Sequence, residues 1–270
     1  MNITAKPEHR LESLDALRGF DMFWIIGGSG IFLALHELFK SPFTHGIQVQ
    51  LSHVKWEGFR FWDLIMPLFL FIVGTAMPFS FAKRIAAGES RRRILTHVFQ
   101  RTAILFVLGM VAQGNLLSYD LSRLHLFSNT LQAIAAGYLL SALALLFLDV
   151  KGQAAGTGAL LVVFWALMAW VPVPGHGSDV FTPEGNLAMY VDRILLGPFR
   201  DGTNYTWILS SLGFAATVLL GVLAGHLLRS SLQPYRKVFL LSIAGCGCVL
   251  AGWAWGLVFP IIKHLWTGSF

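Results

Sequence analysis

Long apolar stretches separated by short polar segments dominate the pattern of this chain. The apolar runs lie near residues 19–39, 59–82, 95–114, 127–148, 156–173, 206–228 and 236–262. Roughly 20 apolar residues in a helix cross the hydrocarbon core of a bilayer, which is about 30 Å thick. The pattern therefore predicts an all-α fold, a polytopic transmembrane helical bundle of about seven spans, organised as a single domain over residues 1–270.

Composition supports a membrane protein. The chain is 55% hydrophobic and only 13% charged, and its mean hydropathy is +0.64. A soluble globule of this size would have too little polar surface. The net charge of +6 does not indicate a nucleic-acid partner, because the Lys and Arg residues sit in short loops between apolar runs, as membrane topology requires. The first apolar run lacks a signal-cleavage pattern and is expected to remain as a span.

The basic residues also predict an orientation. Twelve of the 20 Lys and Arg residues fall in one set of alternating loops and seven in the other, with Arg101 inside a span. The excess places the N-terminus in the cytoplasm. The loop around residue 53, the start of the fourth span and the end of the seventh then face outward. A long extracytoplasmic loop between spans five and six, residues 174–205, is expected to cover or line something.

Charged residues within or at the rim of the spans are candidates for function: Arg18, Asp21, Asp63, Arg101 and Lys263. Each is costly against lipid and should face the bundle interior or a wet cavity. Asp15 and Asp21 both lie three residues from Arg18, so the arginine can pair with either carboxylate. A structural ion pair and a functional one remain open alternatives.

The predicted topology sorts the polar residues into two clusters at opposite faces. The cytoplasmic one holds Asp15, Arg18, Asp21 and Arg101, and the outer one holds His53, Asp63, Asn129, Gln132, Asp192 and Lys263. This division suggests a site that extends through the membrane. His53 by itself could be an ordinary loop histidine. No His or Cys spacing in the sequence favours a metal.

Five motifs in order, spread over almost the whole chain, resemble the heparan-alpha-glucosaminide N-acetyltransferase family. They are RLESLDALRGFDMFWIIGG (10–28), HVKWEGFRFWDLIMPLFLFIVG (53–74), NTLQAIAAGY (129–138), PEGNLAMYVDRILLG (183–197) and KHLWT (263–267). The D-x-x-R-G element in the first is shared widely among membrane acyltransferases. The H-x-x-W-x-G element followed by W-D-L-I-M-P is much more specific.

The resemblance implies a transmembrane acyltransferase that moves an acetyl group from cytosolic acetyl-CoA to the amine of a glucosamine-type sugar on the other side. The family's catalytic histidine matches His53. From its predicted side and its chemistry, Asp63 would orient that histidine or bind a sugar hydroxyl. Acetyl-CoA, a cosubstrate, would meet the cytoplasmic cluster of Asp15, Arg18, Asp21 and Arg101. The expected acceptor or thioester contacts are Trp56, Asn129, Gln132, Asp192 and Lys263. His53 would act as a general base or accept the acetyl group covalently, and the sequence leaves both routes open.

Two departures from the family pattern stand out. Ser29 occupies a position where family members often carry Asn or an acidic residue. The sequence also ends just after KHLWT, where relatives usually continue through several more helices, so we expect a member that is short at the C-terminus.

The expected partners follow from this interpretation. They are membrane lipid, acetyl-CoA and an amino-sugar or glycan acceptor, with no nucleic acid and no metal; a homodimer is left open. The expected location is a bacterial inner membrane. The alternative function is a membrane transporter or carrier of a sugar or lipid-linked precursor, in which the same buried charges form a substrate or proton pathway.

Overall fold

The computed structural model describes residues 12–270, so Arg10 and Leu11 of the first motif and the early basic residues Lys6 and Arg10 lie outside the described residues. Within the described range seven helical segments are long and apolar enough to cross a membrane, which confirms the predicted fold class. They are Glu12–Phe39, Phe61–Ala86, Arg91–Ala112, Thr130–Phe147, Val150–Trp170, Ser211–Arg229 and Pro234–Trp255.

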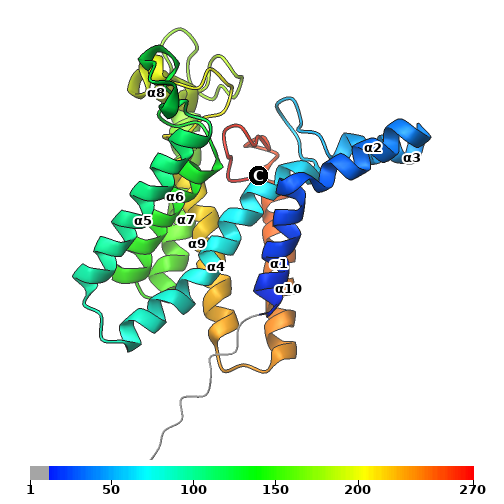
Figure 1. Ribbon diagram of the computed structural model, residues 1–270. Helices are drawn as coiled ribbons and strands as arrows, with labels where there is room; N and C mark the ends of the chain where they lie inside the picture. The colour runs from blue at the N-terminus through cyan, green and yellow to red at the C-terminus, as the bar shows by residue number, and fades with distance from the viewer. Residues whose placement is uncertain (1–11) are drawn as a thin grey trace, which may run out of the picture.

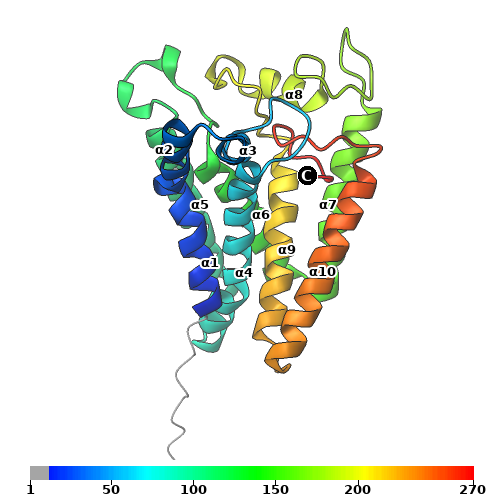
Figure 2. The same ribbon diagram turned by 90° about the vertical axis from the view of Figure 1, so that its right-hand side faces the viewer.

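Helix α9 (Ser211–Arg229) lies at the centre of the bundle. It packs against α4 (Ile65–Ala86), α6 (Thr130–Phe147) and α7 (Val150–Trp170), and α5 (Arg91–Ala112) packs against α6. Helices α1 (Glu12–Phe23) and α10 (Pro234–Trp255) run along the outside of this group (Figures 1 and 2). The core beneath α9 includes the fully or almost fully buried Leu70, Ile134, Phe214 and Val218.

Glycines set the close approach of α4 and α9. A Cβ atom added at Gly74 would overlap the carbonyl oxygen of Val218, and one added at Gly221 would overlap the carbonyl oxygen of Phe71. Small residues let two membrane helices bring their backbones together, which replaces the hydrophobic driving force that lipid cannot provide. The glycine pair therefore fixes α4, which leads directly into the candidate site.

The first span differs from the predicted run 19–39. Its helix begins at Glu12 and is interrupted by a π-helical turn, Trp24–Gly28, in which Gly27 has a φ of +139°. Helix α2 (Ser29–Phe39) then departs from the direction of α1 and pairs with α3 (Pro42–Gln50) as a hairpin that projects sideways (Figure 1). Only glycine adopts such a φ readily, and an apolar run does not reveal the bend that it permits.

The seventh span also ends earlier than the predicted residue 262. Helix α10 stops at Trp255, and Gly256 and Pro260 follow. Proline has no backbone N–H and disfavours helix in the residue before it. Lys263 consequently lies in an irregular segment beyond the helix rather than at its end.

Connecting segments collect at one end of the bundle. The α2–α3 hairpin, the loop over residues 51–60, the α8 segment (Leu187–Leu195) and the C-terminal segment all lie there (Figure 2). Residues that are some 200 positions apart in sequence meet at this end, as Asp63 and Lys263 do.

The α4–α9 contact generates a stability prediction. Gly74→Ala forces the backbones apart and should destabilise the protein by about 1–3 kcal/mol, as overpacking typically does. Gly247→Ala on α10 is the control, because a Cβ there meets nothing within 4 Å and alanine favours helix. Thermal unfolding in detergent should show a lower Tm for the first variant only. Equal Tm values for the two variants would contradict this packing.

Candidate functional site

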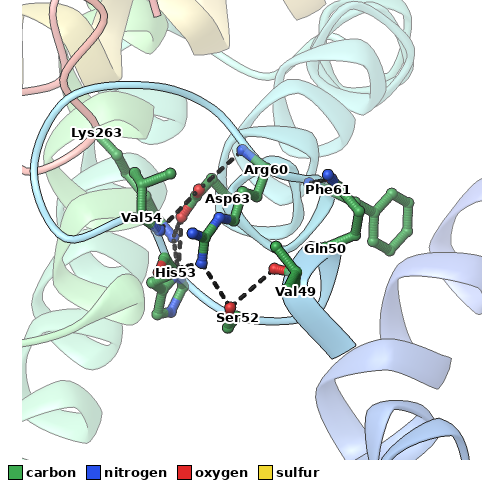
Figure 3. A network of polar contacts seen from close by, with 9 residues as sticks. All are labelled: Val49, Gln50, Ser52, His53, Val54, Arg60, Phe61, Asp63 and Lys263. Carbon is green, nitrogen blue, oxygen red and sulfur yellow. Dashed lines mark hydrogen bonds and ion pairs between the residues drawn. The ribbon is translucent and has the colours of Figure 1, made fainter. Parts of the chain in front are cut away.

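His53 and Asp63 form the centre of the polar end of the bundle (Figure 3). The ring Nδ1 of His53 lies 2.7 Å from Oδ1 of Asp63, whose side chain is fully buried. A short 3-10 turn, Phe61–Leu64, precedes α4 and places the carboxylate. Its other oxygen accepts the backbone N–H of Arg60 at 3.1 Å. An ionised Asp63 can only accept, so Nδ1 carries the proton and Nε2 is left as the basic nitrogen.

Lys263 joins this pair from the other end of the chain. Its Nζ lies 3.3 Å from Oδ1 of Asp63 and 3.1 Å from Nδ1 of His53, and only 4% of its side chain is exposed. Burial lowers the pKa of Lys263, while the attraction of Asp63 opposes that shift. Because Nδ1–H has no free lone pair, the ammonium donates to the carboxylate. One carboxylate is thereby shared between an imidazole and an ammonium.

Arg60 fixes the loop that carries His53. Its guanidinium donates to the carbonyl of His53 at 3.1 Å and to Oγ of Ser52 at 2.7 Å. The backbone N–H of Phe61 donates to Oε1 of Gln50, at the end of α3. The histidine is therefore held on both sides by a closed set of hydrogen bonds, and its side chain remains 46% exposed.

His53 and Lys263 line a cavity of about 690 Å³, here called the histidine cavity. Its rim is polar and includes Asp201, Thr203 and Tyr205, from the end of the segment between α7 and α9. The rest of its lining is largely apolar and comes from α1, the π-helical turn that follows it, α4 and the start of α6, with Met22, Ile25, Ile65, Met66, Phe69, Leu131 and Ile134. The buried Oγ of Ser128, another lining residue, finds no hydrogen-bond partner among the described residues.

An aromatic group supports the rim. The ring of His264 stacks on Trp56 at 5.2 Å and lies 4.4 Å from the ring of Tyr205, centroid to centroid. Burial, with the nearby Lys263 charge, lowers the pKa of His264 to about 4, so this ring is neutral at pH 7. Burial raises the pKa of Tyr205 to about 12. Trp56 donates its indole N–H to the carbonyl of Phe181 at 2.8 Å, and it supports the rim rather than lining the cavity.

Three of the residues expected to bind substrate are engaged in local structure. The side chain of Asn129 lies at the cavity wall, but it caps α6 and donates to the carbonyl of Gly109. The amide of Gln132 bridges the backbone of residues 126 and 128. Asp192 is fully buried and accepts the backbone N–H groups of Trp207 and Ile208 at 2.7 and 3.0 Å. Burial raises the pKa of Asp192 to about 6, against the effect of these bonds.

The other expected cluster lies along α1 and α5. Arg18 and Arg101 line a second cavity of about 500 Å³, here called the arginine cavity. The guanidinium of Arg101 sits 4.7 Å above the ring of Tyr138. Arg18 could pair with either Asp15 or Asp21, and the structure pairs it with Asp15: Nη1 of Arg18 lies 3.2 Å from Oδ1 of Asp15. Asp21 is fully buried, and neither of its carboxylate oxygens has a hydrogen-bond partner among the described residues.

Sequence reasoning missed several members of the site. Arg60, Tyr205 and His264 contact the catalytic candidates or their supports, and Tyr138 faces Arg101. The aromatic and polar run 201–207 at the end of a long loop was a usable signal for the cavity rim. Arg60 had no signal, because an exposed loop arginine resembles any topogenic charge.

Comparison with known proteins gives a consistent but distant similarity. No protein-family model matches the chain. The heparan-alpha-glucosaminide N-acetyltransferase of Mus musculus is 24% identical, over 98% of this chain and 48% of that protein. The Homo sapiens protein of the same name is 23% identical, over 97% of this chain and 46% of that protein. The chain spans about half the length of these curated relatives. The similarity, which covers nearly the whole chain, supports a distant relationship to the heparan-alpha-glucosaminide N-acetyltransferases.

Proposed function

We propose that this protein transfers an acetyl group from acetyl-CoA, bound at one face of the membrane, to the amine of a glucosamine-type sugar at the other face. The observation that carries the proposal is the imidazole of His53, held by the buried Asp63 and exposed to a 690 Å³ cavity. The distant similarity to N-acetyltransferases supports the reaction class. The N-terminus faces the cytoplasm in this proposal, so that Arg18 and Arg101 meet the donor there.

The chemistry required is removal of a proton from the attacking amine. A sugar amine is largely protonated near neutral pH and is a nucleophile only after deprotonation. The ammonium proton is first released to solvent, and Nε2 of His53 then accepts a second proton from the nitrogen as the neutral amine attacks the thioester carbonyl carbon. The carbon–sulfur bond then breaks, and the imidazolium returns the proton to the thiolate. Asp63 keeps the ring in the required tautomer and orientation throughout.

The covalent variant uses the same nitrogen. Nε2 attacks the thioester first, an acetyl-histidine forms as the thiolate leaves, and the amine then displaces the imidazole. Trapping of labelled acetyl on the protein in the absence of acceptor distinguishes this route from direct transfer.

Polar groups on the rim of the histidine cavity suit a sugar. Asp201 and Thr203 present a carboxylate and a hydroxyl to the cavity, although both also hold the local turn through hydrogen bonds to each other, and the Oγ of Ser128 has no partner among the described residues. Trp207 closes the wall, with its ring stacked 5.1 Å from that of Phe127. Aromatic and hydroxyl-bearing side chains together are a common lining for small polar ligands.

The arginine cavity suits the nucleotide end of the donor. Its two guanidinium groups, from Arg18 and Arg101, provide planar donors of the kind that bind phosphates. The aromatic ring of Tyr138 holds Arg101 in place from below. In this proposal Asp15 positions Arg18 through their ion pair, whereas Asp21 makes no contact with the donor.

The first prediction concerns His53. His53→Ala should lower acetyl transfer from acetyl-CoA to glucosamine acceptors by about 10²- to 10⁴-fold, the usual worth of a general base. His45→Ala is the matched control, because His45 is an exposed histidine at the same end of the bundle. The measurement is the initial rate with purified protein in detergent. If both variants keep the rate of the unmodified protein, His53 has no part in the chemistry. If acetyl-CoA is neither bound nor consumed while sugar moves across liposomes, the protein is a transporter.

The second prediction concerns pH. Lys263→Met removes the ammonium group that shares Asp63 with His53. The carboxylate then has the imidazole as its only cationic side-chain partner, and no neighbouring ammonium opposes the imidazolium form. The acidic limb of the pH–rate profile should move to higher pH by about one unit, since a charge at this distance has effects of that size. Lys55→Met, an exposed lysine of the same loop, should leave the profile in place. An unchanged profile, or a shift to lower pH, would contradict the shared-carboxylate arrangement.

The third prediction concerns the donor. Arg101→Gln should raise the KM for acetyl-CoA by about 10- to 100-fold, the cost of losing a hydrogen bond to a charged group, with little change in kcat. Arg92→Gln on the same helix is the control, because Arg92 is exposed and lines neither cavity. A KM unchanged in Arg101→Gln would place the nucleotide elsewhere.

A further inference from the structure

The two cavities meet at two side chains. Met22 of α1 and Phe69 of α4 line both the arginine cavity and the histidine cavity. Along the first span the order is Arg18 and Met22 of α1, then Ile25 of the π-helical turn, so Met22 separates the arginine end from the histidine end. Phe69 has the same place on α4, between Met66 in one cavity and Ile72 in the other.

Together the two cavities extend over a length close to the thickness of the hydrocarbon core of a bilayer. Their lining extends along α4 from Ile65 to Phe81, which is about 24 Å at the helical rise per residue. The hydrocarbon core is about 30 Å thick. A molecule whose charged end rests at Arg18 and Arg101 therefore has to pass Met22 and Phe69 to reach His53.

The side chains of Met22 and Phe69 differ in how freely they can change rotamer. Met22 is 39% exposed, and an unbranched thioether side chain changes rotamer easily. Phe69 is partly buried and packs against the core formed with α6 and α9. One wall of the narrowing is thus movable and the other is fixed. Both are apolar, so the closed arrangement opposes the passage of water and ions between the two faces.

We propose that Met22 and Phe69 form the constriction through which the slender thioester arm of the donor passes, and that Met22 is its movable side. The inference rests on the proposed function and adds a determinant of donor selectivity to it. The constriction admits the uncharged, narrow thioester end of the arm and holds back the phosphorylated nucleotide. It also keeps the membrane sealed while the acetyl group reaches the histidine cavity.

The test uses Met22→Trp, which places a larger side chain in the constriction and leaves the charged residues of both clusters unchanged. The control is Ile26→Trp, in the same span, where the side chain is 79% exposed and lines neither cavity. Three quantities are measured on purified protein in detergent: CoA binding, transfer from acetyl-CoA, and transfer from S-acetyl-N-acetylcysteamine, a short thioester without a nucleotide. The short donor can enter the histidine cavity from its own rim.

The expected result is selective. Met22→Trp should still bind CoA through Arg18 and Arg101, and it should lose about 10- to 100-fold more turnover with acetyl-CoA than with the short thioester, because only the nucleotide-tethered thioester is held out of position. Ile26→Trp should match the unmodified protein with both donors. Undiminished turnover of Met22→Trp with acetyl-CoA, or an equal loss with both donors, would overturn the constriction. An unmodified protein that neither binds CoA nor consumes acetyl-CoA would instead overturn the proposed function itself.

Discussion

The rest of the site depends on the buried carboxylate of Asp63. A fully buried charge in a membrane-spanning helix is expensive unless it is paired and hydrogen-bonded. Here it accepts from His53, Lys263 and the backbone of Arg60. These contacts tie together three parts of the chain: the loop before α4, the start of α4 and the segment after α10. Satisfying one charge thus assembles the site, because each partner that stabilises Asp63 is also placed beside the others.

The fold supplies a rigid frame for this assembly. The glycines of α4 and α9 bring the two backbones into contact, so the first turn of α4 is set by the packing of the bundle rather than by the loop. Helix α1 borders the cavities and is only lightly packed elsewhere, with Leu14 and Asp21 as its buried residues. A fixed helix on one side and a less constrained helix on the other is an arrangement that suits a passage which must open and close.

The features best predicted from sequence were those that depend on the composition of long stretches of the chain. The seven spans followed from hydropathy, because a lipid-exposed helix must be apolar over its whole length. The grouping of His53 with Asp63 and Lys263 followed from the predicted side of the membrane and from side-chain chemistry, with Asp63 expected either to orient the imidazole or to bind a sugar hydroxyl. What sequence could not supply was set by backbone geometry: the bend at Gly27, the early end of α10 and the choice of Asp15 over Asp21 as partner of Arg18. The structural roles of Asn129, Gln132 and Asp192 were also beyond sequence, since a polar residue that caps a helix or binds a backbone looks in sequence like one that binds a ligand; their role toward substrate stays a prediction.

The most direct test of the account is the sidedness of the reaction in sealed proteoliposomes, with labelled acetyl-CoA on one side of the membrane and a glucosamine acceptor only on the other. The account predicts labelled acetyl on the acceptor, from vesicles that stay impermeable to both reactants, and no label with His53→Ala. Label that appears only when donor and acceptor share a compartment would contradict transfer through the membrane.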